Sequence, residues 1–201
     1  MFSFFAKRYR RRFEKKGFEA SQKQLMAGLR QAGFRHATVL EIGSGVGYLH
    51  HTLLQEGAES AMGVELSARM LEEARIWAQE KGLAERTRYI EGDFLAIADE
   101  IPPAEVVVMD KVVCCYPDAE GLVKAAVARS GRVLALTYPR DRWITRAGEV
   151  LGTILLKLIG SDFRPYVHDP EAIEEWICNA GFRKQFQDQT FIWLTQIYIK
   201  A

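Results

Sequence analysis

Acidic residues and glycines gather where apolar segments of this chain end, and their types suit nucleotide binding. The stretch TVLEIGSGVGYL (38–49) runs from an apolar segment into Glu41 and then places Gly43, Gly45 and Gly47 at alternate positions. Glycine is costly inside a strand or helix, so this cluster marks backbone that turns tightly or approaches a ligand closely. Main-chain amides at the start of a helix favour an anionic or polar ligand. The stretch therefore predicts a ligand-binding turn.

Three further acids follow apolar segments downstream. Glu65 closes SAMGVEL 18 residues after Gly47, at a spacing where a carboxylate can accept hydrogen bonds from both ribose hydroxyls. Asp93 lies in EGDF, and Asp110 ends VVVMD. Ligands of an open parallel sheet bind beyond the carboxyl ends of its strands, so these acids are expected to share one site. The alternative for Glu65 and Asp93 is a structural role, as caps of the helices that follow them.

The segments that must position these acids alternate between strand and helix from residue 37 onward. Continuous Val, Ile and Leu runs predict buried parallel strands, and apolar residues at helical spacing predict helices between them. The last segment alternates in polarity and predicts an antiparallel β-hairpin with its turn near Asp188-Gln189. The fold class is therefore α/β, a doubly wound and mostly parallel seven-stranded sheet with helices on both faces and a C-terminal antiparallel hairpin.

Length and composition set further bounds. The chain has 201 residues, 48% apolar and 26% charged, which predicts one globular domain over 1–201 and excludes a disordered chain. No apolar run approaches the length of a bilayer-spanning helix. Three cysteines, Cys114, Cys115 and Cys178, form no metal-type pair. We expect no metal site and a cytoplasmic location.

The amino-terminal segment is strongly basic. Residues 1–20 hold seven Lys or Arg and two Glu, a net charge of +5, which leaves about −4 for the rest of the chain. Phe5, Tyr9 and Phe13 recur every four residues, so residues 1–33 are predicted to form a basic helical cap. Its charges either lie in solvent or attract a phosphate-bearing partner or an anionic surface.

The glycine pattern distinguishes between nucleotide cofactors. A dinucleotide enzyme would carry G-x-G-x-x-G, whereas this chain has E-x-G-x-G-x-G from Glu41 to Gly47. This pattern resembles motif I of the class I S-adenosylmethionine (SAM)-dependent methyltransferases. EGDF (91–94) resembles the motif of that family whose Asp accepts the adenine amino group, here Asp93. The resemblance covers residues 37–140 well and the remainder more loosely.

The resemblance implies SAM as cofactor and assigns a role to each motif. Glu65 would bind the ribose, and Asp110 would line the methyl-transfer site. The cofactor-binding residues that it implies are Glu41, Gly43, Ser44, Gly45, Gly47, Glu65, Leu66, Asp93, Phe94 and Asp110.

The methyl acceptor should meet the segment MDKVVCCYPD (109–118). It lacks the N/D-P-P-F/Y motif of enzymes that methylate exocyclic amines of bases, and no Pro-Cys pair marks a cysteine nucleophile. The segment resembles one in a group of small bacterial methyltransferases of unassigned substrate, some of which look related to magnesium-protoporphyrin O-methyltransferases. Asp110 and Tyr116 are the catalytic candidates here, with packing or capping as the alternative, and Lys111 is expected in solvent.

The stretch 141–168 is longer than a simple crossover requires. Ile144, Ala147, Leu151, Ile154, Leu155 and Leu158 fall on one helical face. Such an insert would form a lid over the active site, a core helix, or a helix on a bilayer surface, the first two being preferred. His168 follows in RPYVHDP and is a third catalytic candidate, as a general base, although a lone loop histidine more often caps or lies in solvent.

Together these features predict a SAM-dependent methyltransferase that acts on a small organic acceptor, apolar with a carboxyl or hydroxyl group. RNA is the alternative acceptor, because of the basic first 20 residues. A SAM-binding module without catalysis and a NAD dehydrogenase are the remaining alternatives. Peripheral membrane contact stays open.

Overall fold

Seven strands form one sheet in the computed structural model, which describes residues 6–158, 160 and 163–201. The strands are β1 (Thr38–Ile42), β2 (Ser60–Glu65), β3 (Thr87–Glu91), β4 (Ala104–Asp110), β5 (Ser130–Pro139), β6 (Phe182–Gln189) and β7 (Trp193–Lys200). The helices are α1 (Ala6–Lys16), α2 (Ala20–Ala32), α3 (Tyr48–Gln55), α4 (Ala68–Glu80), α5 (Phe94–Ile97), α6 (Ala119–Arg129), α7 (Trp143–Leu158) and α8 (Pro170–Asn179).

The strand order is β3-β2-β1-β4-β5-β7-β6, with β7 antiparallel to both of its neighbours. Strand β1 pairs with β2 on one side and β4 on the other, so the order reverses between β1 and β4. This is the place where open α/β sheets bind ligands. The doubly wound sheet and its terminal hairpin confirm the predicted fold class.

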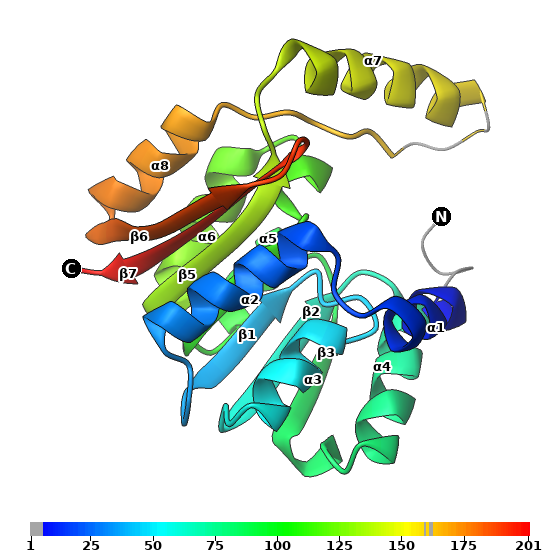
Figure 1. Ribbon diagram of the computed structural model, residues 1–201, viewed down its shortest axis with the longest axis vertical. Helices are drawn as coiled ribbons and strands as arrows, with labels where there is room; N and C mark the ends of the chain where they lie inside the picture. The colour runs from blue at the N-terminus through cyan, green and yellow to red at the C-terminus, as the bar shows by residue number, and fades with distance from the viewer. Residues whose placement is uncertain (1–5, 159, 161–162) are drawn as a thin grey trace.

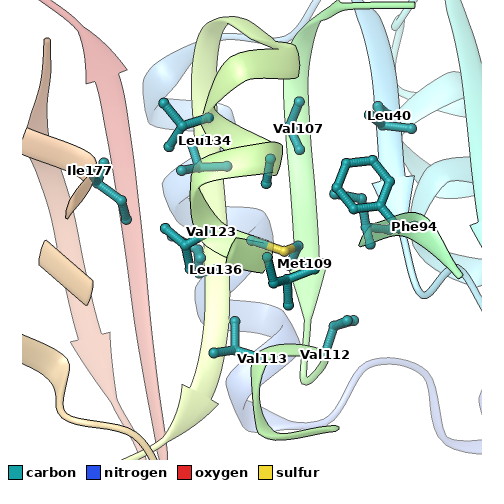
Figure 2. Packing of buried hydrophobic residues seen from close by; sticks show 14 of the residues in the cluster. Leu40, Phe94, Val107, Met109, Val112, Val113, Val123, Leu134, Leu136 and Ile177 are labelled. Atoms are coloured by element: carbon teal, nitrogen blue, oxygen red, sulfur yellow. The ribbon is translucent and has the colours of Figure 1, made fainter. Parts of the chain in front are cut away.

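Alternate side chains of the central strands pack in the hydrophobic cores on the two faces of the sheet. These strands are therefore apolar at successive positions. Val107 and Met109 of β4 face α5, α6 and α8, whereas Val106 and Val108 face α2 and α3. Figure 1 shows α2 and α3 in front of the sheet and α6 and α8 behind it. Figure 2 shows the rear core between β4, β5 and α6, with Met109 at its centre.

Polar side chains cap the starts of several helices. The side chains of Ser67, Asp118 and Asp169 accept a hydrogen bond from a main-chain N–H in the first turn of α4, α6 and α8, respectively. Pro170 is the first residue of α8, where its fixed φ suits a helix and its missing N–H costs nothing. Helices α1 and α2 lie within the segment 1–33 that was predicted to be helical, and Phe5 lies outside the described residues.

Two details differ from expectation. The hairpin turns at 190–192, because β6 continues through the predicted turn residues to Gln189. Helix α7 is not a core helix, because every one of its residues is at least partly exposed. Within the described part of the chain, no helix is long and apolar enough to cross a membrane.

Candidate functional site

The three glycines after β1 all adopt left-handed backbone, yet each is needed for a different reason. Gly43, Gly45 and Gly47 have φ of 68°, 53° and 84°. A Cβ on Gly43 would lie 2.5 Å from Val112 Cγ2, and one on Gly47 would lie 2.9 Å from the His50 ring. A Cβ on Gly45 would meet no atom within 4 Å. Gly43 and Gly47 thus permit close packing of the turn, and Gly45 presents bare backbone to open space.

This difference gives a first prediction. Gly45→Ala should lower the free energy of unfolding by about 1–2 kcal/mol through backbone strain and weaken SAM binding about tenfold or more, because the new methyl group enters the open space. Gly82→Ala is the matched control, since Gly82 also has a left-handed φ of 66° and open surroundings. Calorimetric titration and thermal unfolding of both variants are the measurements. Equal loss of stability with equal SAM affinity would show that Gly45 does not face the ligand.

Glu65 at the end of β2 braces the glycine turn. Its Oε2 accepts a hydrogen bond from the Gly45 N–H and its Oε1 accepts one from the Ser67 N–H, both at 3.0 Å. A carboxylate oxygen can accept more than one hydrogen bond, so both oxygens retain capacity for a ribose. Leu66 beside it is 64% exposed, an apolar surface on which an adenosine could lie.

Asp93 and Tyr116 meet beyond β3. The Tyr116 hydroxyl donates to Asp93 Oδ1 at 2.7 Å, and the same oxygen accepts from the Leu95 N–H at the start of α5. Asp93 therefore does cap a helix, and its Oδ2 remains for an adenine amino group. The structure thus brings Tyr116 to the predicted adenine position. Burial together with the neighbouring Asp93 raises the pKa of the Tyr116 hydroxyl, which keeps that proton in place.

Glu41 is paired with a histidine that the sequence did not single out. Its Oε2 accepts a hydrogen bond from the His50 main-chain N–H at 3.2 Å and lies 2.5 Å from His50 Nδ1. Burial raises the pKa of Glu41 and lowers that of His50 to about 3, so burial disfavours a charge on either group. His51 and Tyr89 extend the network, with His51 Nε2 2.6 Å from the Tyr89 hydroxyl. Glu41 thus anchors α3 beneath the turn.

Asp110 at the end of β4 is held in a largely buried environment. Its Oδ2 accepts from Gln22 Nε2 at 2.8 Å, and Gln22 Nε2 also lies 2.5 Å from the Tyr48 hydroxyl. Its Oδ1 is buried and has no hydrogen-bond partner among the described residues. Burial raises the pKa of Asp110 to about 7, the Gln22 hydrogen bond opposes this rise, and the nearby Glu41 carboxyl adds to it. Asp110 is thus poised to exchange a proton near neutral pH.

Lys111 was expected in solvent, and this was wrong. It adopts left-handed backbone with φ of 62°, which turns its side chain against the ring of Trp193, 4.8 Å from the ring centroid. Its ammonium group also pairs with Glu19 at the start of α2. Burial lowers the pKa of Lys111 to about 8. The strand end thus places a cation directly after the acid.

His168 and the cysteines flank the loop after β4. His168 Nε2 lies 2.9 Å from the Tyr116 carbonyl oxygen, and the Tyr166 N–H donates to the Cys114 carbonyl at the same distance. The return segment of the insert therefore lies on this loop, and His168 can act as a base only through Nδ1. The hydrogen bond with Cys115, together with burial, raises the pKa of the Cys114 thiol, which disfavours a thiolate nucleophile.

Two predicted cofactor contacts can involve only the main chain. Ser44 is 3% exposed and its hydroxyl lies against Gly63 of β2, where a Cβ would be 2.7 Å away. The Phe94 side chain is 1% exposed and packs in the rear core, as Figure 2 shows. Any ligand contact from either residue would use its backbone.

The site also contains residues that sequence reasoning missed. They are Gln22, Tyr48, His50, His51, Tyr89 and Trp193. Two adjacent histidines directly after a glycine-rich turn were a usable signal for the buried network. No sequence signal marked Gln22 or Trp193, because each reaches the site from a helix or strand that is remote in sequence.

The residues present fit SAM. The glycine turn offers open backbone at Gly45. The carboxylates of Glu65 and Asp93 can each accept further hydrogen bonds beyond those that they already make. Asp110 has a buried oxygen without a hydrogen-bond partner in the part of the chain that the structure describes. All lie at the carboxyl ends of β1, β2, β3 and β4, beside the point where the strand order reverses. This fold and this arrangement of residues are typical of class I SAM-dependent methyltransferases.

Comparison with known proteins agrees with this class. Residues 39–135 match the methyltransferase domain family. The chain is 28% identical over 176 residues to the ubiquinone biosynthesis O-methyltransferase of Pseudomonas paraeruginosa, covering 84% of this chain and 74% of the relative. It is similar in structure to magnesium protoporphyrin IX methyltransferase from Synechocystis PCC 6803 with bound S-adenosylhomocysteine, with TM-score 0.73, 21% identity, and 97% and 94% of the two chains covered.

The fold alone would not decide the chemistry. The [4+2]-cyclase SpnF also shares it, with TM-score 0.67, 12% identity, and 90% and 81% of the two chains covered. The family match and the motif residues therefore carry the assignment. Among the described residues, no three His, Cys, Asp or Glu side chains are grouped so that they could hold a metal ion.

Proposed function

We propose that the chain acts as a single domain that methylates a hydroxyl or carboxyl oxygen of a small organic acceptor. The observation that supports this is Asp110, a carboxylate with one oxygen hydrogen-bonded by Gln22 and the other buried without a hydrogen-bond partner among the described residues. Because its pKa is raised to about 7, its ionised form can accept a proton from an acceptor at neutral pH.

Different residues of the site would bind the cofactor and transfer the proton. SAM supplies an electrophilic methyl group when bound. Glu65 would bind the ribose hydroxyls, Asp93 with Tyr116 would bind the adenine edge, and the Gly45 backbone would approach the cofactor. Asp110 would orient the acceptor hydroxyl and take its proton, and Gln22 would hold the Asp110 carboxylate in one orientation. We propose His168 as a positioning residue that holds the Tyr116 loop through its carbonyl contact.

Lys111 and Trp193 support an acidic aromatic acceptor. The ammonium group lies over the indole ring and pairs with a surface carboxylate, Glu19. An acceptor carboxylate could exchange with Glu19, and an aromatic ring could pack beside Trp193. The names of the two relatives refer to the biosynthesis of ubiquinone and to magnesium protoporphyrin IX, and both compounds are organic molecules rather than nucleic acid.

RNA is a weaker alternative. Helix α1 keeps exposed basic side chains at Lys7, Arg11, Lys15 and Lys16. Arg10, however, bonds to Glu73 and Glu80 and ties α1 to α4, so part of the basic segment has a structural role. The free cysteines Cys114, Cys115 and Cys178 support a reducing compartment, and we propose the cytoplasm.

The testing experiment has two stages. Calorimetric titration with SAM, S-adenosylhomocysteine and NAD should show binding of the first two and none of NAD. Methyl-labelled SAM is then incubated with phenols, aromatic carboxylic acids and transfer RNA. We expect label in a phenol or carboxylic acid. SAM binding without label in any acceptor would favour a non-catalytic module, label in RNA would favour the alternative, and no SAM binding would overturn the proposal.

A further inference from the structure

Helix α7 presents its apolar side chains to the outside of the molecule. Trp143, Val150, Leu151, Ile154, Leu155 and Leu158 are each between 51% and 77% exposed. At about 100° per residue these side chains fall within about 140° of arc. The opposite side lies against the protein, where a Cβ on Gly152 would be 3.4 Å from Pro165. The helix stands beyond the carboxyl end of β5, separate from both helical layers (Figure 1).

Basic residues border this apolar face. Arg142, Arg146 and Lys157 project on one edge of the helix and are exposed. Arg146 is paired with Asp141, at 2.6 and 2.7 Å, and Glu149 is the one acid within the helix. Long cationic side chains beside an apolar face can reach lipid phosphates while the face enters the acyl boundary.

The hairpin tip continues the same surface. Phe191 and Ile192, between β6 and β7, are 63% and 45% exposed. Arg142 lies over the Phe191 ring at 5.4 Å, which joins the base of α7 to the tip. Two elements remote in sequence therefore expose large apolar side chains next to shared cations, and such contiguous patches mark interaction sites.

We infer that α7 and the 190–192 turn form a docking surface for an anionic lipid bilayer, on which α7 lies in the interface plane. The width of the apolar face of α7 and its single basic edge favour a bilayer as the partner. A second copy of the chain is disfavoured, because the basic edges of the two copies would meet. The surface lies beside the carboxyl end of β5 and of the sheet, so an acceptor dissolved in the membrane could reach the site. Lipid binding itself does not depend on the proposed acceptor.

The test is cosedimentation of the full chain with vesicles of phosphatidylcholine alone or with phosphatidylglycerol, without SAM or acceptor. We expect binding that is stronger with phosphatidylglycerol, and a blue shift of Trp143 emission that is absent in Trp143→Phe. The double variant Leu151→Glu/Leu155→Glu should bind phosphatidylglycerol vesicles at least about tenfold more weakly than the wild type. Ile76→Glu is the matched control, because Ile76 is a 40% exposed apolar residue on α4.

Calorimetric SAM binding, measured on every variant, reports an intact fold independently of lipid. Wild-type protein that stays in solution with both vesicle types would overturn the inference. So would a double variant that binds vesicles as tightly as Ile76→Glu. A dimer that dissociates in the double variant, with no vesicle binding, would assign the face to a second copy instead.

Discussion

Glu65→Gln should weaken SAM binding by about a hundredfold, equivalent to about 2–3 kcal/mol. Both carboxylate oxygens accept a main-chain N–H, one from Gly45 and one from Ser67. An amide must turn its NH₂ group toward one of these donors, which loses that hydrogen bond and loosens the glycine turn. It also removes the charge that strengthens hydrogen bonds from ribose hydroxyls. Calorimetric titration with SAM measures the effect.

Glu91→Gln provides the matched control for this variant. Glu91 lies directly beside Glu65 in the register of β2 and β3, and it is exposed. The two substitutions therefore remove the same charge at nearly the same place, and only one of them touches the glycine turn. We expect wild-type affinity for Glu91→Gln. An equal loss in both would mean that the effect is electrostatic at long range and that Glu65 does not bind the ribose.

Asp110→Asn should lower kcat by about a hundredfold or more while making the folded protein more stable at pH 8. The amide oxygen can still accept the Gln22 hydrogen bond, so the geometry is kept, but an amide cannot take a proton from the acceptor. In the wild type a partly buried carboxylate must be ionised at this pH with one oxygen unpartnered, which costs stability. Steady-state rates and thermal unfolding measure the two effects.

The sign of the stability change follows from the pKa. In the folded state the pKa of Asp110 is raised to about 7 from an ordinary value of 3.8. Between these values the folded state binds more protons than the unfolded state, so wild-type stability falls as pH rises from about 4 to 7. Asp110→Asn lacks this dependence. We expect a gain of about 1–3 kcal/mol over wild type at pH 8 and almost none at pH 4.

Gln22→Leu separates proton transfer from packing at this position. It removes the hydrogen bond that lowers the Asp110 pKa, so the rising limb of the rate against pH should move to higher pH. A loss of rate that is uniform across pH would indicate disturbed packing around Tyr48 instead. An Asp110→Asn variant with wild-type kcat would exclude Asp110 as the base.

Local sequence determined the framework of this protein. Continuous apolar runs predicted the parallel strands, because a strand buried on both faces needs apolar residues at every position. The positions of the E-x-G-x-G-x-G turn, Glu65, Asp93 and Asp110 were predictable because each lies at or close to the carboxyl end of a strand, and parallel strands end at one edge of the sheet. Capping residues such as Asp169 mark the starts of helices, because their side chains bond to main-chain N–H groups only two or three residues away.

Tertiary structure alone determined which side chains contact the residues at the strand ends. Gln22 reaches Asp110 across 88 positions of sequence, and Glu19 reaches Lys111 across 92. No periodicity records such contacts, because they depend on where α2 packs on the sheet. The same holds for α7, whose apolar stripe suited either a core or an exposed helix. Only packing, which leaves every residue of α7 partly exposed, showed that its apolar face has no cover within the described chain.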